Sequence, residues 1–467
     1  MMDDNFFRQA RFHFFRIDRI FLENFRCFSA FDLELNRKER KVNCRDEELA
    51  VAPLTVIVAP NGIGKTSILD AIRIVFASFI SSFGYKNKVK INEKDIRIQE
   101  NLLSLPVIID AVGELGYSWY EWECRIPKGS KQFSQTVGGV KNIVGNPFKN
   151  FLKSLNHDAI NSHEISWPLL ASYGTNRLWK KSNNYAKRNL IKDRDLGYES
   201  CLEAASNYAT AFGWMFDAVM SKINEQTIEI IQDDVLRIQL STVEKALATI
   251  LEPEGYIASL HFDPYFKELA IIQMRDSEKV SIPVSSLSDG VRAVFFMVAD
   301  IAFRCVKLNP HLRALAAQET EGIVMIDEIE LHLHPSWQQK ILDTLQIIFP
   351  KIQFIVTTHS PQVVSSVPSE CVRIIDQGKV FYAVGTEGAE ASRVLKRIFG
   401  TEAFPENNPQ RIKLNKYLDL VYAGNWETNE ALQLRDELNN IYQGEEPLLG
   451  QVDLFIENEK WERDHDA

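Results

Sequence analysis

The sequence has few cysteines, and their spacing matches neither a disulfide scaffold nor a zinc site. There are six in 467 residues, and no two of them form a CxxC pair. They are Cys27, Cys44, Cys124, Cys201, Cys305 and Cys371. Small disulfide-stabilised folds and zinc ribbons depend on closely spaced cysteines. The lack of such spacing argues against both classes and predicts reduced thiols.

The sequence also lacks a long apolar run and an excess of basic charge. No apolar stretch approaches the roughly 18 residues of a membrane span, and residues 1–5 lack the basic start of a secretion signal. Lysine and arginine number 53 against 63 aspartate and glutamate, which gives a net charge of −10. Such an acidic chain does not coat nucleic acid generally, so any DNA contact is local or supplied by a partner. We therefore expect a cytoplasmic protein without membrane contact.

What the sequence does contain is a phosphate-binding loop. Residues 59–66 read Ala-Pro-Asn-Gly-Ile-Gly-Lys-Thr, after the apolar run 54–58 and before the helix-like run 67–72. Small residues let backbone N–H groups surround phosphate oxygens, the lysine reaches the outer phosphates, and the threonine hydroxyl can ligate Mg²⁺. The candidate nucleotide contacts are Asn61, Gly62, Gly64, Lys65, Thr66 and Ser67. Ala59 replaces the usual first glycine, and we expect alanine to fit there because the strand ends at this position.

A second motif places two carboxylates at the end of a strand. The apolar run 322–326 leads directly into Asp327 and Glu328. In this arrangement, called Walker B, Asp327 would share the Mg²⁺ with Thr66 and Glu328 would activate the water that attacks the γ-phosphate. Two exposed acids at a strand end are a common alternative. Pairing with the phosphate loop favours the catalytic interpretation.

Two further motifs present polar groups at helix N-termini. Residues 287–292 read Leu-Ser-Asp-Gly-Val-Arg and open a helix, so Ser288 and the Gly290 backbone could bind an anion; a simple N-cap explains Ser288 equally well. A strand over 353–358 is followed by His359, and Ser360 and Pro361 are expected as N-cap and first helical residue. His359 would then lie where ligands bind in open α/β sheets, as a candidate catalytic γ-phosphate contact, although a lone histidine is more often structural.

The order of these four motifs resembles the ABC-type ATPase heads of the SMC, RecF and OLD group. Residues 17–28, which contain Asn-Phe-Arg, are similar to the opening strand of those heads. The resemblance implies that Arg26 reaches the nucleotide phosphates. It also implies a homodimer with two ATP·Mg²⁺ sites, each between Lys65 of one chain and Ser288 of the other, and leaves room for a higher oligomer.

Further residues of the chain resemble one branch of this group. Residues 169–179 and 298–302, together with a helical tail, resemble the PtuA ATPases of Septu-type anti-phage systems. That resemblance implies an ATPase that regulates a partner HNH nuclease similar to PtuB, with nucleic acid reached through the partner. Two alternatives remain. One is a DNA-repair head that clamps DNA itself, and the other is a transporter subunit, for which we locate no Q-loop glutamine.

The positions of the motifs predict the organisation of the chain. We expect an α/β class, an ABC-type ATPase head of the P-loop NTPase type, with an inserted helical lid and an α-helical C-terminal tail. The predicted parts are 1–178 and 285–387 for the head, 179–284 for the helical insertion with a hairpin, and 388–467 for the tail. The insertion begins with a cation-rich stretch, 180–195, which is a candidate DNA contact but more simply a solvated loop. The sequence contains no sustained heptad run, so we expect no coiled-coil arm.

The tail is expected to be a string of short helices. We predict helices over 391–399, 411–422, 429–442 and 449–461, with no run of strands for a nuclease domain. The second of these helices carries a large apolar set, Leu414, Tyr417, Leu418, Leu420 and Val421. One free helix cannot leave such a set in water. We therefore expect it to cover the head, a sister protomer or a partner.

Overall fold

The chain forms two compact units in the computed structural model, residues 1–389 and residues 390–467. The structure describes residues 15–44, 47–82, 89–115, 118–128, 136–137, 141–142, 166–177, 194–203, 208–227, 234–276, 278–401 and 407–465. The cation-rich stretch expected at 180–195 therefore lies almost wholly outside the described residues. Among the helices that are described, none combines the length and the apolar character of a membrane span.

The centre of the first unit is a mostly parallel sheet. Its strands, in spatial order, are β12 (Leu169–Tyr173), β16 (Gly322–Ile326), β17 (Ile352–Thr358), β5 (Leu54–Val58), β18 (Val372–Asp376) and β19 (Lys379–Tyr382). The first five are parallel to their neighbours, and β19 runs antiparallel to β18. Every residue of β5, β12, β16 and β17 is buried, as expected for a parallel sheet covered on both faces. The carboxyl ends of these strands meet at one edge.

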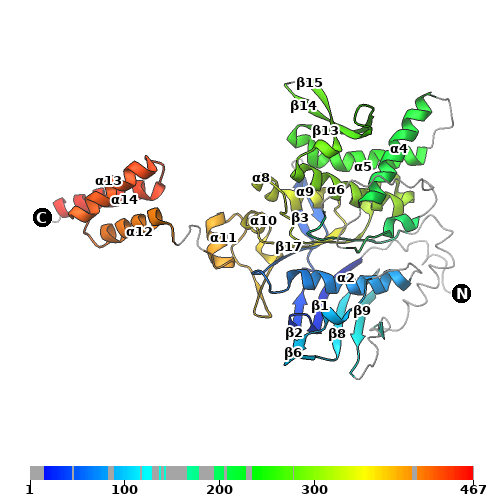
Figure 1. The fold of residues 1–467 in the computed structure, drawn as a ribbon, viewed down its shortest axis with the longest axis horizontal. Helices are drawn as coiled ribbons and strands as arrows, with labels where there is room; N and C mark the ends of the chain where they lie inside the picture. Colours follow the sequence, from blue (N-terminus) through cyan, green and yellow to red (C-terminus); the bar gives the residue numbers. More distant parts are fainter. Residues whose placement is uncertain are drawn as a thin grey trace. The chain divides into compact units, whose positions relative to one another are not determined.

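A second, antiparallel sheet covers one side of this unit. Its strands are β1 (Phe15–Phe25), β2 (Phe28–Glu34), β8 (Val107–Leu115), β9 (Ser118–Ile126), β10 (Thr136–Val137) and β11 (Lys141–Asn142). Helix α2 (Lys65–Ser82) lies between the two sheets (Figure 1), where Phe76 contacts Phe15 and Trp122 at ring-centroid distances of 5.9 and 6.5 Å. Gln353 of β17 joins the sheets directly, because its side-chain amide bonds both backbone groups of Ile17 at 3.0 and 2.9 Å.

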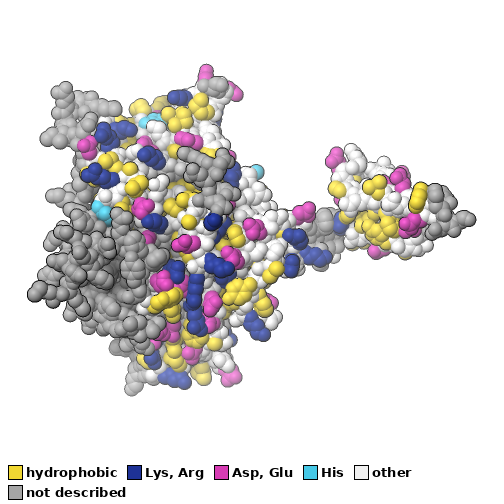
Figure 2. All heavy atoms as spheres, turned by 180° about the vertical axis from the view of Figure 1, so that it is seen from behind, with side chains coloured by type: hydrophobic (Ala, Val, Ile, Leu, Met, Phe, Trp, Pro, Cys, Tyr) yellow, Lys and Arg dark blue, Asp and Glu magenta, His cyan; other side chains and the backbone are white. Residues whose placement is uncertain are grey.

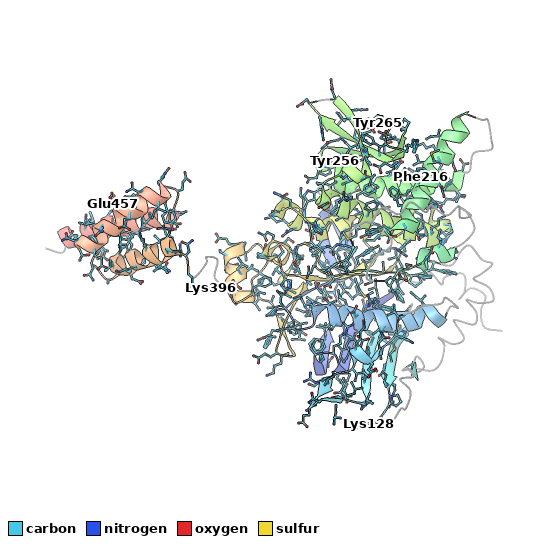
Figure 3. The ribbon with its side chains drawn as sticks, viewed as in Figure 1. Lys128, Phe216, Tyr256, Tyr265, Lys396 and Glu457 are labelled. Carbon is cyan, nitrogen blue, oxygen red and sulfur yellow. The ribbon has the colours of Figure 1, made fainter. Side chains whose placement is uncertain are left out.

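Helices cover the other face of the parallel sheet (Figure 1). They include α4 (Ala209–Thr227), α5 (Asp234–Leu251) and α6 (Asp289–Leu308), and residues 293–308 of α6 are all buried. Next to α5 is a three-stranded sheet of β13 (Tyr256–Asp263), β14 (Glu268–Arg275) and β15 (Glu278–Pro283), so the predicted hairpin is confirmed. Phe216 of α4, which is labelled in Figure 3, contacts Phe262 of β13 edge-on, with ring centroids 5.8 Å apart. In its described part, the expected lid is thus a helix pair packed on α6 and this small sheet.

The remaining elements of this unit are short. They are β3 (Arg40–Cys44), β4 (Glu47–Val51), β6 (Ile98–Gln99), β7 (Leu102–Leu103), α7 (Ala316–Glu319), α8 (Pro335–Gln338), α9 (Ile341–Ile348) and α10 (Pro361–Ser365). The predicted α/β class with a phosphate loop between β5 and α2 is confirmed by this arrangement.

The second unit is entirely helical in its described residues. Its helices are α11 (Ala391–Ile398), α12 (Pro409–Tyr422), α13 (Asn429–Tyr442) and α14 (Pro447–His465). Their shared core consists of Leu414, Tyr417, Val421, Trp426, Ala431, Leu438, Leu449 and Val452. The expectation that the apolar face of α12 covers the head, a sister protomer or a partner is therefore wrong. Its buried residues pack against α13 and α14, because the tail supplies its own small core.

Candidate nucleotide-binding site

The strand order brings the predicted motifs to one edge of the parallel sheet. The phosphate loop follows β5, the Asp327 segment follows β16, and the His359 segment follows β17. Because β17 lies between β5 and β16, its last residues stand between the phosphate loop and Asp327. The site is therefore built from three adjacent strand ends, and β12 extends it on the far side of β16.

The phosphate loop has the backbone shape that its glycines allow. Gly62 and Gly64 have φ of +82° and +106°, a region that residues with a side chain rarely adopt. A Cβ at Gly64 would also lie 2.5 Å from Cys27 Sγ, so only glycine fits. Ala59 is not among the residues with positive φ, in keeping with the expectation that alanine fits there. Its carbonyl accepts a 2.7 Å hydrogen bond from Lys65 Nζ.

Lys65 is buried, and it lies near the acids of the segment that follows β16, one strand beyond β17. Burial lowers the pKa of its ammonium group, while Asp327, Glu328 and Glu330 act in the opposite direction. Its ammonium donates to the carbonyls of residues 59 and 60. A phosphate group would offer this buried cation a full negative charge in place of those neutral carbonyls.

Thr66 and Asp327 meet directly. The Thr66 hydroxyl donates to Asp327 Oδ2 at 2.8 Å, although 261 residues separate the two positions. The other carboxylate oxygen accepts from the Thr357 hydroxyl at 2.5 Å. Hydroxyl and carboxylate oxygens are the hard ligands that Mg²⁺ prefers. The donor set thus fits the metal predicted from the sequence, with Thr66 and Asp327 as the residues that would hold it.

Glu328 has an unusual backbone conformation. Its φ is +49°, a left-handed conformation that costs a residue with a side chain about 1–2 kcal/mol. Its N–H donates to the Thr357 hydroxyl at 2.8 Å, and its carbonyl accepts from the N–H of Leu331 at 2.9 Å. Strained backbone of this kind collects at functional sites, where the surrounding bonds hold it.

The His359 segment has the predicted cap. Ser360 is the N-cap of α10 and Pro361 is its first residue, as expected. Glu330, from the Asp327 segment, accepts from the Thr358 hydroxyl at 2.7 Å and from the His359 N–H at 2.5 Å. Burial lowers the pKa of His359, and the nearby Lys65 charge lowers it further, against smaller effects of the acids. This lowered pKa favours the neutral imidazole.

Residues 287–292 open α6 as predicted. Ser288 is the N-cap, although its hydroxyl accepts from the Val291 N–H only at 3.5 Å, and its side chain is exposed. Gly290 lies close to the loop after Glu328, since a Cβ there would be 2.6 Å from the carbonyl oxygen of His332. The N-cap interpretation of Ser288 holds, and it leaves the exposed helix N-terminus open to a ligand.

Arg26 lies beside the start of α2, but acids engage its guanidinium. It forms ion pairs with Asp70 at 2.6 Å and Asp95 at 2.8 Å, and it reaches the Ser67 hydroxyl at 3.4 Å. Its place next to the phosphate loop agrees with the implied contact with the nucleotide, whereas its two carboxylate partners would have to share it. The role of Arg26 remains a prediction.

Three residues that sequence reasoning did not single out complete the site. Thr357 holds both Asp327 and Glu328, Glu330 holds the His359 backbone, and Arg177 donates to the carbonyls of Asp327 and Glu328. Thr357 lies in the strand predicted over 353–358, Glu330 follows the Walker B acids by two residues, and Arg177 lies within residues 169–179. Their types gave no further signal, because threonine, glutamate and arginine are common at the ends of strands.

Comparison with protein families agrees with this geometry. Residues 19–252 match the model described as "AAA domain". Residues 146–365 match a second one, described as "AAA domain, putative AbiEii toxin, Type IV TA system". Together the two matches run from the opening strand β1 to the helix α10 that follows His359.

Three curated proteins illustrate the similarity. The "Retron Ec83 probable ATPase" of Escherichia coli is 26% identical, over 96% of this chain and 88% of its own length. The "Retron Vc95 probable ATPase" of Vibrio cholerae is 27% identical, over 69% of each chain. The "Septu protein PtuA" of Bacillus thuringiensis is 23% identical, over 75% of this chain and 79% of its own. Among solved structures, the SMC head domain from Thermotoga maritima aligns over 79% of this chain and 100% of its own, with 15% identity and a TM-score of 0.40.

Proposed function

Because this chain belongs to the AAA domain family, whose model spans residues 19–252, we propose that it is the ATP-hydrolysing subunit of an anti-phage defence complex. It is an ATPase related to retron and Septu proteins, and its phosphate loop binds ATP. The observation that carries the proposal is the 2.8 Å contact between Thr66 and Asp327. This contact brings both expected Mg²⁺ ligands together beside Lys65.

The proposed roles follow from position and chemistry. Lys65 binds the outer phosphates, Thr66 and Asp327 hold Mg²⁺, and Glu328 activates the attacking water. His359, neutral and at the same sheet edge, contacts the γ-phosphate. When bound, the metal neutralises charge on the phosphates.

The second part of the proposal is a composite site between two copies of the chain. Ser288 is exposed at the N-terminus of α6, a 20-residue helix whose partial positive charge favours an anion. We expect each nucleotide to lie between Lys65 of one protomer and Ser288 of its partner. Each site would then need both chains, and hydrolysis would be linked to opening of the dimer.

Sedimentation velocity tests this composite site. The Glu328→Gln chain, which should bind ATP without hydrolysing it, is expected to form a dimer with ATP and Mg²⁺. Adding Ser288→Arg should prevent the dimer, whereas Ser259→Arg, at another exposed serine on β13, should not. A chain that stays monomeric with ATP, or a dimer that tolerates Ser288→Arg, would contradict the composite site.

The third part is that the ATPase controls a separate effector, an HNH nuclease similar to PtuB. The relation to the Septu protein PtuA supports this choice. A docking surface is available on α12, α13 and α14, whose side chains include apolar groups open to solvent (Figure 2). They are Ile412, Tyr422, Leu432, Ile441, Leu454 and Trp461, each between 39% and 63% exposed. Apolar surface of this kind is typical of protein contacts.

Co-purification with a co-expressed HNH nuclease similar to PtuB tests the regulatory role. The full chain should retain the nuclease, and a chain ending after Ala389 should not. The alternative, a repair-type head that binds DNA itself, predicts ATP-dependent and salt-sensitive DNA binding by the pure chain. Basic and acidic side chains are interspersed over the described part of the face drawn in Figure 2. DNA cleavage by the purified chain alone would overturn the regulatory role.

A further inference from the structure

Arg177 holds the backbone of Asp327 and Glu328, which follow the neighbouring strand β16. It follows β12, and its guanidinium is buried, with the residue only 3% exposed. One terminal nitrogen donates to the Asp327 carbonyl at 2.5 Å, and the other donates to the Glu328 carbonyl at 2.6 Å. The planar fork of arginine suits two adjacent acceptors, whereas a lysine ammonium has no such geometry.

The turn that carries Arg177 is itself fixed to the same segment. The Tyr173 carbonyl accepts from the Asp327 N–H at 2.8 Å. The Arg177 N–H donates to the Gly174 carbonyl at 3.2 Å, which closes the turn. The Tyr173 hydroxyl donates to Asp300 of α6 at 2.8 Å, so the turn is also anchored to the helix whose N-cap is Ser288. Residues 173–177 therefore hold three backbone groups of the Asp327 segment.

This hold matters because Glu328 is in a left-handed conformation, with φ of +49°. Such a conformation persists only where the surrounding bonds fix it. The Thr357 hydroxyl fixes the N–H side of Glu328, and Arg177 fixes its carbonyl side together with the Leu331 N–H. Without Arg177 this carbonyl would keep only its bond from the Leu331 N–H, so the backbone would be less firmly held and the carboxylate would shift from its place.

We propose that Arg177 is a positioning residue for ATP hydrolysis, which sets the direction of the Glu328 carboxylate through the backbone and makes no contact with the nucleotide. The proposal rests on the proposed role of Glu328 as the group that activates water. Both terminal nitrogens of Arg177 are occupied by carbonyl oxygens, so the guanidinium acts on the protein and leaves phosphate binding to Lys65.

The test is a comparison of kcat and ATP affinity in the full-length Arg177→Lys chain. The lysine keeps the charge and loses the planar fork. We expect kcat to fall about 100-fold, because a displacement of about 1 Å at a reacting group has an effect of this size. The Kd for ATP should stay within about two-fold of the wild-type value. Arg194→Lys is the matched control. Arg194 also donates to a backbone carbonyl, that of Leu308 at 2.7 Å, in a different part of the unit, and its variant should keep kcat.

A double variant separates positioning from general support of the fold. In a Glu328→Gln chain the carboxylate is already lost, so adding Arg177→Lys should cause no further loss of turnover. If the lysine variant does not fold, Arg177→Gln, whose amide can still donate to one carbonyl, is measured with the same expectation. Wild-type kcat in the folded variant, or a rise in Kd that matches the loss of kcat, would overturn the proposal. Full turnover by Glu328→Gln alone would instead overturn the proposed function.

Discussion

Within the first unit and within the helical unit, different kinds of contact are prominent. In the first unit the candidate site depends on polar contacts between distant positions, such as Thr66 with Asp327 across 261 residues. In the helical unit the core is apolar and local, and ion pairs such as Lys413 with Glu437 are about 40% exposed. Exposed pairs contribute only about 0–1 kcal/mol each. The difference indicates that single atoms decide the chemistry of the first unit, while total apolar burial decides the stability of the second.

The largest effect is expected from removing the cation of the phosphate loop. Lys65→Ala removes the ammonium that would bind the outer phosphates, and two lost charge-assisted hydrogen bonds of about 1.5–3 kcal/mol each weaken binding by a factor of about 100 or more. Equilibrium dialysis with ATP and Mg²⁺ measures this loss. Lys340→Ala, at an exposed lysine paired with Glu254, serves as the control and should bind like the wild type. Equal ATP binding by Lys65→Ala and wild type would refute the site.

Glu328→Gln should separate binding from hydrolysis. The amide keeps the size of the side chain but cannot accept a proton, so kcat should fall by a factor of about 10² to 10⁴ while the Kd for ATP stays the same. Phosphate release under saturating ATP gives kcat, and dialysis gives Kd. Rapid hydrolysis by this variant would place the general base elsewhere.

Sequence reasoning reached the positions of the strand ends but could not find the contacts between them. The loops after β5, β16 and β17 were predicted because each follows an apolar run, and the helix over 429–442 agrees with α13. The hold of Arg177 on Glu328 depends on β12 lying beside β16, and no local pattern encodes that neighbour. The apolar face of α12 was predicted, but the helices that pack on it, α13 and α14, were not. Amphipathic spacing does not indicate which element packs on an apolar face.

In the helical unit the effects should concern stability alone. Leu438 is fully buried in the shared core, so Leu438→Ala should destabilise this unit by about 2–5 kcal/mol. Hydrogen exchange of the amides in α12, α13 and α14 reports the change, and ATP turnover should remain at the wild-type level. Lys413→Ala, which removes only an exposed ion pair, should cost less than about 1 kcal/mol. A loss of turnover in Leu438→Ala would show that the two units are coupled.

A smaller effect is expected from pH at His359. Burial and the charge of Lys65 lower the pKa of this histidine below its ordinary value of about 6.5, so the imidazole is protonated at a lower pH than a free one. If the neutral form is required, kcat/KM should decline at acidic pH with a midpoint below about 6.5. His359→Gln, which cannot be protonated, should lose this acidic limb. An acidic limb with its midpoint above about pH 6.5 that disappears in His359→Gln would contradict the assignment.

The most direct test of the difference between the units is ATP turnover by a chain that ends after Ala389, the last residue of the first unit. This end point preserves β19, which an earlier cut at Gln377 would remove. The account predicts a kcat per chain and a Kd for ATP within about two-fold of the full-length values, because every residue of the candidate site lies before this point. Retained ATP binding with lost turnover would contradict the account, since the helical unit would then supply part of the catalytic site or of the dimer that completes it.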